Sequence, residues 1–168
     1  MNMSRLSAWL VVVMFNIILV FTANAANITY KETRPVLPPH SNGGPVELFI
    51  GMIGDSKREG IRRELVVECV SSCTLFTNLM KDGLVCARPK TVLVFHQFVV
   101  ATDFVIEGNV LKSYKIASVV RGAAFKRIWE KYPPHVRMKI MKKSTNGGLP
   151  PHGKELKISA DDLGIPRC

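Results

Sequence analysis

The first 25 residues constrain the chain most strongly, because they have the features of a segment that is removed before folding. They carry one early positive charge, Arg5, followed by an apolar run from Ala8 to Phe21, and they end in Ala23-Asn24-Ala25. This is the layout of a secretory signal peptide with a small-x-small cleavage site. The alternative is an uncleaved anchor, but the run is short for a membrane span, which needs about 20 apolar residues. We therefore predict an exported protein, most simply a periplasmic one.

Residues 26–168 have the length of one domain and are numerous enough to bury a core. The predicted signal peptide contains Arg5 and no acidic residue, so its removal lowers the formal net charge from +10 to +9. The charges are scattered in pairs such as Arg62-Arg63 and Lys142-Lys143, without interleaved aromatic residues. We therefore expect a solvated basic surface, no nucleic-acid partner and no stable membrane span after signal cleavage. An anionic envelope polymer is a less favoured partner.

Four cysteines follow the predicted cleavage site, and they are Cys69, Cys73, Cys86 and Cys168. An even number of cysteines in an oxidising compartment predicts two disulfides, with three possible pairings among which the sequence does not choose. Zinc is the alternative, but the spacing of the first two cysteines is one residue wider than the usual zinc-binding pair. The four histidines form no ligand-spaced set with them, so we expect neither a metal nor another cofactor.

Hydrophobic patterns and turn residues predict a mixture of strands and helices, and hence an α/β or α+β fold. A turn at Gly43-Gly44 precedes a helix that starts at Val46 and ends before Gly60. Residues 102–114 are ambiguous, and Ser159 is placed to cap a final helical turn. The expected strands are residues 62–69, 84–87, 91–95 and 155–158. The other expected helices are one that begins at Ser71 or Ser72, one at residues 116–131 and one at residues 135–143.

Two strand ends carry the residue types needed for nucleophilic catalysis. The strand of residues 62–69 leads into Ser71-Ser72 at a predicted helix start, where free backbone N–H groups could stabilise an oxyanion. The strand of residues 91–95 leads into His96, which could act as a general base. The alternatives are structural: either serine could be a helix N-cap, His96 could be a core or rim histidine, and Gly43-Gly44 could be only a turn.

The order of these features resembles the proteolytic subunit of the Clp protease and its relatives in the crotonase superfamily. The shared order is a Gly-Gly turn, a helix, a strand, a serine turn, a helix, two strands and a His-Gln strand end. Ser71 and His96 are 25 residues apart. The resemblance implies a single domain with a spiral strand-helix core and a helical C-terminal tail. It also implies Ser71 as nucleophile, His96 as base, and the N–H groups of Gly44 and Ser72 as the oxyanion site.

The chain is also similar, over nearly all of residues 42–168, to a group of small, exported and mostly uncharacterised Clp-protease-like proteins of alpha-proteobacteria. The shared features are a cysteine-bracketed serine turn, a Val-Cys-x-x-Pro strand, a strand end with histidine, a Tyr-Pro-x-x-Val-Arg segment, a Gly-Gly-Leu turn and a final Arg-Cys. In this chain they are Cys69–Thr74, Val85–Pro89, Val94–His96, Tyr132–Arg137, Gly147–Leu149 and Arg167-Cys168.

The chain departs from the Clp pattern at the third member of the triad. The Clp family has an acid in the region of residues 142–146, which here is Lys-Lys-Ser-Thr-Asn. Asp103, Glu107 and Asp161-Asp162 are the available carboxylates, and Asn146 is a neutral candidate for orienting the imidazole. Two functions follow: a periplasmic serine hydrolase, of peptidase type, with a Ser71–His96 dyad, or a non-catalytic relative that binds a peptide or partner protein.

The expected partners follow from the same resemblance. The chain has no room for the long handle through which Clp rings assemble, so we expect a monomer or small oligomer. No ATPase partner is expected outside the cytoplasm.

Overall fold

The structure is a computed structural model that describes residues 30–37, 40–107, 110–151 and 153–168. The predicted signal peptide, residues 1–25, lies outside this part of the chain. None of the helices in the described residues is long and apolar enough to cross a membrane. The fold is a mixed α/β fold with three small sheets, which agrees with the coarse fold class expected from the sequence.

The first sheet is entirely parallel and has the strand order β1-β2-β4. Its strands are β1 (Glu32–Val36), β2 (Ile61–Leu65) and β4 (Val85–Ala87). Alternate residues of β2 are buried, and all three residues of β4 are buried. Strand β1 is not among the strands expected from the sequence.

The second sheet places the two strand ends of interest next to each other. It contains β3 (Glu68–Val70), β5 (Val92–Phe95) and β8 (Leu156–Ser159), in the order β3-β5-β8. Strands β3 and β5 are parallel, and Val70 pairs with Val94. Since neighbouring parallel strands are about 4.8 Å apart, the residues that follow β3 and β5 lie at the same edge of this sheet.

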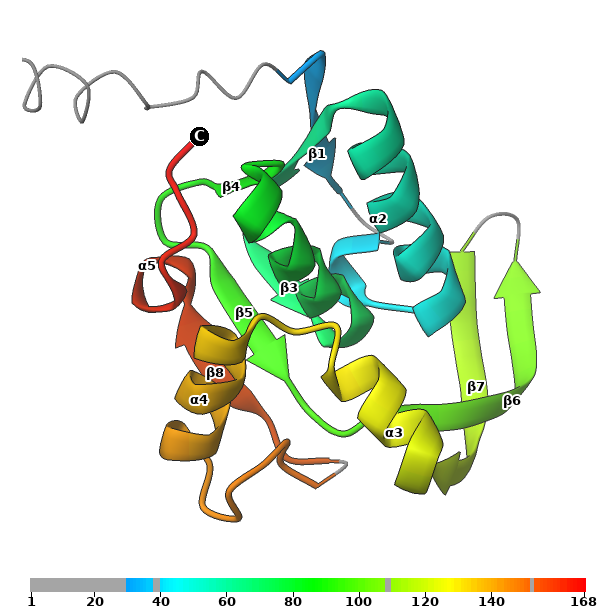
Figure 1. Cartoon of the computed structure of the whole chain (residues 1–168). Coiled ribbons are helices and arrows are strands. Elements are labelled where there is room, and N and C mark those ends of the chain that lie inside the picture. The colour runs from blue at the N-terminus through cyan, green and yellow to red at the C-terminus, as the bar shows by residue number, and fades with distance from the viewer. Residues whose placement is uncertain (1–29, 38–39, 108–109, 152) are drawn as a thin grey trace, which may run out of the picture.

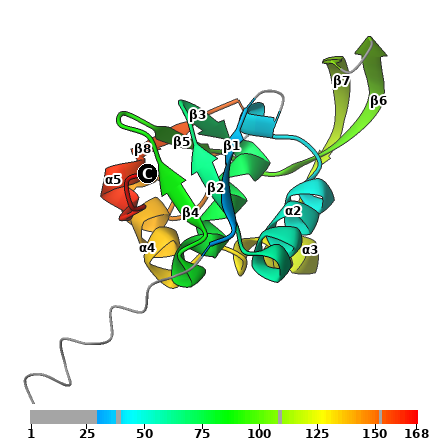
Figure 2. The same cartoon turned by 90° about the horizontal axis from the view of Figure 1, so that it is seen from above.

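Helices cover the strands mainly on one side, which faces the viewer in Figure 1 and lies below the strands in Figure 2. The short helix η1 (His40–Asn42) precedes α2 (Val46–Glu59), and the 3-10 helix η2 (Ser71–Asp82) follows β3. Helices α3 (Gly122–Trp129), α4 (Pro134–Lys143) and α5 (Ala160–Leu163) complete the set. Helix α2 ends at Gly60 in a left-handed conformation and Ser159 caps α5, as the sequence predicts.

Two predicted elements differ in the structure. Residues 62–69 do not form one strand, because β2 ends at Leu65 and β3 starts at Glu68 in a different sheet, with Val67 exposed between them. Residues 116–119 do not start a helix but end β7 (Val110–Val119), which pairs with β6 (Val99–Glu107) in an antiparallel hairpin. This hairpin occupies the segment that the sequence leaves ambiguous, and it extends away from the other strands in Figures 1 and 2.

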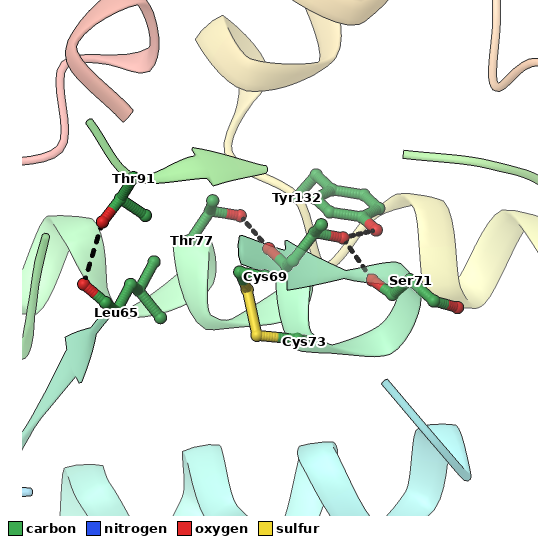
Figure 3. Close-up of a disulfide and its surroundings, with 8 residues drawn as sticks. Leu65, Cys69, Ser71, Cys73, Thr77, Thr91 and Tyr132 are labelled. Carbon is green, nitrogen blue, oxygen red and sulfur yellow. Dashed lines mark hydrogen bonds between the residues drawn. A yellow bond between two sulfur atoms is a disulfide. The ribbon is translucent and has the colours of Figure 1, made fainter. Parts of the chain in front are cut away.

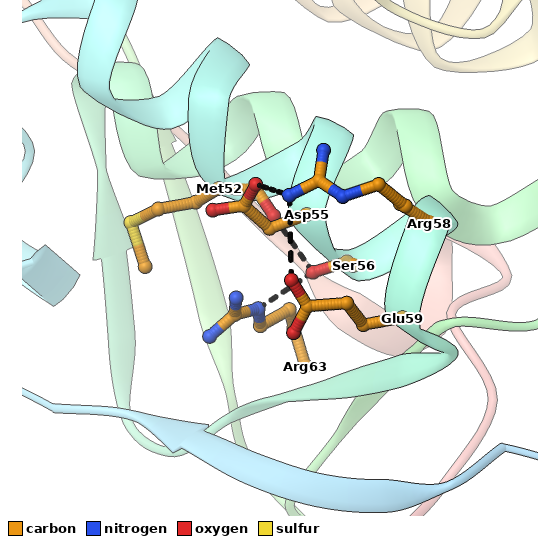
Figure 4. Close-up of polar contacts among 6 residues, drawn as sticks. All are labelled: Met52, Asp55, Ser56, Arg58, Glu59 and Arg63. Carbon is orange, nitrogen blue, oxygen red and sulfur yellow. Dashed lines mark hydrogen bonds and ion pairs between the residues drawn. The ribbon is translucent and has the colours of Figure 1, made fainter.

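A buried polar contact fixes α2 against β2. The Nε of Arg63 donates to Ser56 Oγ at 2.7 Å, and Ser56 Oγ donates to the carbonyl of Met52 at 2.8 Å (Figure 4). Arg63 is 8% exposed and its guanidinium lies above the ring of Phe76, 5.9 Å from the centroid. Burial lowers the pKa of Arg63, and the nearby Arg34 lowers it further.

Two disulfides are present, as the sequence predicts, and the structure gives their pairing. Cys69 bonds to Cys73 across the start of η2, and Cys86 of β4 bonds to Cys168. Structural disulfides persist in oxidising compartments. Two bonded pairs therefore indicate an extracellular or periplasmic protein.

Candidate active site

Ser71 lies at the sharp turn between β3 and η2 and has an unusual backbone conformation. Its φ angle is 55°, in the left-handed region that residues other than glycine seldom adopt. Two other non-glycine residues in the described part share this property, but Lys90 lies in the turn between β4 and β5, and Asp103 lies at an irregularity of β6. Ser71 alone among the three joins a strand to a helix, which is the position of an exposed nucleophile in a nucleophile elbow.

Gly43 lies directly against Ser71. A Cβ atom at Gly43 would be 2.9 Å from Ser71 Cβ and 2.9 Å from the carbonyl oxygen of Val70. Its φ angle is 88°, so a side chain here would be strained as well as crowded. The structure therefore brings the Gly-Gly turn and the serine turn together, although they are far apart in the sequence.

Ser72 connects the same two turns through its side chain. Its Oγ donates a hydrogen bond of 2.7 Å to the carbonyl of Gly44, and the residue is 1% exposed. Gly44 is exposed and Ser71 is half-buried. In the described part of the chain, the N–H of Gly44 donates no backbone hydrogen bond. The two predicted oxyanion residues are thus in contact, beside the predicted nucleophile.

Neither serine caps the helix. The N-cap of η2 is Val70, and no side chain forms a cap hydrogen bond there. The structural alternative in which Ser71 or Ser72 serves as an N-cap is therefore wrong. The hydroxyl of Ser72 bonds to Gly44 instead, because the close approach of the glycine turn provides an acceptor outside the helix.

The carbonyl of Ser71 is held by a chain of buried hydroxyl groups. Thr74 Oγ1 donates to this carbonyl at 2.6 Å, and the hydroxyl of Tyr132 lies 2.6 Å from the same Oγ1 (Figure 3). Since Thr74 uses its only hydrogen for Ser71, Tyr132 is the donor in the second bond. Burial raises the pKa of Tyr132 far above its ordinary value, so the phenol stays protonated and can donate.

His96 follows β5 directly and lies half-buried beyond the strand end next to that of Ser71. Its Nδ1 is 2.8 Å from the carbonyl oxygen of Gln97. A carbonyl only accepts hydrogen bonds, so this contact requires a proton on Nδ1 and leaves the lone pair of the neutral ring on Nε2. That tautomer is the one a general base needs.

The Cys69–Cys73 disulfide brackets the serine turn. The two Cα atoms are 5.2 Å apart, and both side chains are buried, Cys69 at 1% and Cys73 at 0% exposure. Cys69 belongs to β3 and Cys73 to η2, so the bond joins the two elements between which Ser71 lies (Figure 3). It restricts the motion of the turn from the buried side.

Three of the carboxylates that the sequence offers for the triad have other partners in the structure. Asp103 pairs with Lys115 at 3.2 Å, Asp161 bonds to Arg167, and Asp162 pairs with Lys143 at 2.7 Å. The side chain of Glu107 lies outside the described part of the structure.

Asn146 interacts within its own loop, with Ser144 Oγ and the carbonyl of Leu149. The carbonyl of Gln97 is therefore the acceptor that the structure gives to His96 Nδ1.

Thr74 and Tyr132 are the site residues that sequence reasoning missed. The contact between them spans 58 residues, and no local pattern marks either residue as polar support for a turn. In the sequence, Tyr132 belongs only to the Tyr-Pro-x-x-Val-Arg segment of the resemblance. The one signal available is the position of Thr74, three residues after Ser71 at a helix start. From there a threonine hydroxyl can reach the carbonyl one turn back.

A cavity of about 640 Å³ lies elsewhere, between the end of η2 and the segment that joins α3 to α4. Tyr132 lines it, but Ser71 and His96 do not. Among the described residues, no group of three or more His, Cys, Asp or Glu side chains could hold a metal ion.

Compared with protein families, with curated proteins and with solved structures, the chain gives no match.

Proposed function

We propose that this chain is an exported serine hydrolase of peptidase type with a Clp-protease-like fold, in which Ser71 is the nucleophile. The conformation of Ser71 is the observation that carries the proposal. A serine with φ of 55° at a strand-to-helix turn, with a glycine pressed against it, is costly in backbone energy. Such strain is concentrated at functional sites, and a helix cap does not require it.

The mechanism uses groups that the chain itself supplies. Ser71 Oγ attacks the carbonyl carbon of an ester or peptide bond, and its proton passes to Nε2 of His96. The carbonyl π electrons move to oxygen, where the N–H groups of Gly44 and Ser72 bind the oxyanion. The tetrahedral intermediate then collapses, the leaving group takes the proton from His96, and water hydrolyses the acyl-enzyme by the reverse sequence.

The arrangement of elements supports the Clp-protease-like fold. The resemblance requires the glycine turn, the serine turn and the histidine strand end to meet at one site. Here Gly43 touches Ser71, and β5 pairs in parallel with β3. The signal-peptide pattern of residues 1–25 and the two disulfides support a periplasmic location.

A non-catalytic role in binding a peptide or protein is the second candidate, and one observation favours it. Residues 142–146, where the Clp family has its acid, are Lys-Lys-Ser-Thr-Asn, and Asp161 and Asp162 form ion pairs with Arg167 and Lys143. The Nδ1 of His96 contacts the carbonyl of Gln97. A carbonyl fixes the tautomer but stabilises the imidazolium less than a carboxylate does. A relative that keeps the cleft but has lost the acid would show this geometry.

Labelling with a fluorophosphonate probe distinguishes the two candidates. We expect residues 26–168, with both disulfides formed, to gain one adduct by intact mass, on Ser71. Ser71→Ala should abolish the adduct and His96→Ala should slow it at least about a hundredfold. Ser118→Ala and His135→Ala are the matched controls, because both residues are exposed and distant in sequence from the site. Folded protein without an adduct would refute the hydrolase and leave peptide binding as the function.

A further inference from the structure

Most of the net charge of this chain is concentrated in one segment. Residues 121–143 contain eight lysines and arginines and a single acid, Glu130, so they carry +7 of the total +10. The segment forms α3 and α4, which lie on the same side of the molecule in both views of the fold (Figures 1 and 2). The positive charge of the chain is therefore concentrated on two helices.

Helix α4 presents apolar side chains in the middle of this charge. It packs into the core through Val136 and Ile140, which are both fully buried. On the opposite side, Met138 is 60% and Met141 42% exposed. The two methionines are three residues apart in the helix, so their side chains are neighbours on its surface. They form one exposed apolar patch on the helix, and apolar patches with a polar rim are a feature of surfaces that bind membranes or other proteins.

The two methionines are flanked by cations. At 100° per residue, Lys142 lies beside Met138, while Arg137 and Lys139 lie on the two borders between the exposed and buried sides. We call these five residues the α4 face. Within the described part of the chain none of its three cations forms a salt bridge, whereas the neighbouring Lys143 pairs with Asp162. Lys139 interacts with Asp162 only through the longer-range attraction that helps to lower the pKa of that carboxyl, so the α4 face is positive charge around an apolar centre.

Helix α3 has the same combination of positive charge and partly exposed apolar side chains. Lys126 and Arg127 are exposed, and Phe125 and Trp129 are half-buried with their rings stacked, 5.9 Å apart. No residue of α3 is fully buried. Cationic side chains beside partly exposed apolar and tryptophan side chains suit the interface of a bilayer, where the cations meet headgroups and the apolar groups enter the acyl boundary.

From this geometry we propose that the α4 face docks the protein on a membrane surface rich in anionic phospholipid. The charge is complementary to such a surface, and each lysine or arginine near it strengthens binding about fivefold. The exposed methionines distinguish a bilayer from an anionic polymer, because a polymer would use the cations alone. This docking is peripheral and independent of the proposed hydrolase activity.

Vesicle co-sedimentation tests the proposal with residues 26–168, which contain every helix and strand described above. We expect binding to vesicles of equimolar phosphatidylcholine and phosphatidylglycerol, and none to phosphatidylcholine alone. The double variant Lys139→Gln/Lys142→Gln should lower the partition coefficient at least about tenfold. Met138→Gln/Met141→Gln should also lower it, with the net charge unchanged. Thermal melting shows whether each variant remains folded; both pairs of side chains are exposed.

A charge-matched variant provides the control. Lys31→Gln/Lys90→Gln removes two exposed lysines outside residues 121–143 and should lower binding far less than the α4 pair. Equal losses for the two lysine pairs would overturn a localised docking face. An unchanged affinity in the methionine variant would overturn insertion into the bilayer. Binding to dextran sulfate without binding to vesicles would show a polymer-binding protein instead.

Discussion

At the scale of single residues, the serine turn is held by backbone contacts that leave little room for change. Ser71 is bounded by Gly43 on one side, and its carbonyl is bonded by Thr74 on the other. The resemblance predicts that Ser71, Ser72 and Gly44 share one site, and in the structure Ser72 contacts Gly44. The support from Thr74 and Tyr132 could not be predicted, since it depends on which buried hydroxyl groups meet after folding.

Gly43→Ala should destabilise the fold and abolish labelling of Ser71. The added Cβ would lie 2.9 Å from both Ser71 Cβ and the Val70 carbonyl, at a φ of 88°. We expect a loss of about 1 to 3 kcal/mol in the free energy of unfolding, measured by urea denaturation. Gly51→Ala is the matched control: this site in α2 is open, and alanine favours a helix. Equal stability of the two variants would contradict the close approach.

At the scale of elements, the sequence predicts the ends of helices well where local capping sets them. It predicts strands poorly, because strand pairing joins residues that are far apart in the chain. Gly60 and Ser159 mark the end of α2 and the start of α5 because capping needs only neighbouring atoms. The run through Val66 and Val67 looks like one strand, but its two ends pair with different partners in different sheets. Residues 116–119 look helical but pair with β6, a contact that periodicity cannot reveal.

Tyr132 connects η2 to the segment between α3 and α4, and this connection should give the protein a distinct alkaline response. Burial raises the pKa of the folded phenol above its ordinary value of 10.0. Above pH 10 the unfolded chain therefore loses a proton that the folded chain keeps, so the free energy of unfolding falls as pH rises. Its slope is at most about 1.4 kcal/mol per pH unit for this group.

Urea denaturation between pH 8 and about pH 11 checks this prediction. Tyr132→Phe should be about 1 kcal/mol less stable at pH 8, where it lacks the hydrogen bond to Thr74. Its stability should fall less steeply above pH 10 than that of the unaltered chain. Tyr30→Phe, which alters an exposed tyrosine, should retain the steep fall. Parallel curves for all three proteins would refute the assignment to Tyr132.

At the scale of the whole molecule, the Cys86–Cys168 disulfide ties the last described segment to the first sheet. Residues 166–168 also bond to the backbone of Ala87, through the carbonyl of Pro166 and the N–H of Cys168. The two cysteines are 82 residues apart. The sequence predicts the number of disulfides but not their pairing, because pairing depends on the distances that the complete fold creates.

Removing this bond with Cys86→Ala/Cys168→Ala should lower the free energy of unfolding by about 4 to 5 kcal/mol, since a long loop restricts the unfolded chain strongly. The matched variant Cys69→Ala/Cys73→Ala opens a loop with a separation of only four residues and should cost about 2 kcal/mol. Urea denaturation of both variants measures the difference. A larger loss in the short-loop variant would show that native contacts at the serine turn, and not loop length, set these energies.

The pairing also has a consequence for the order in which the exported chain matures. In a chain that enters an oxidising compartment from its N-terminus, Cys69 and Cys73 arrive before Cys86 and Cys168, so joining the cysteines in order of arrival makes the native bond first. Once it has formed, Cys86 has a single remaining partner, Cys168, which emerges last. Correct oxidation then requires no isomerase, and the serine turn is closed before the rest of the domain can fold around it.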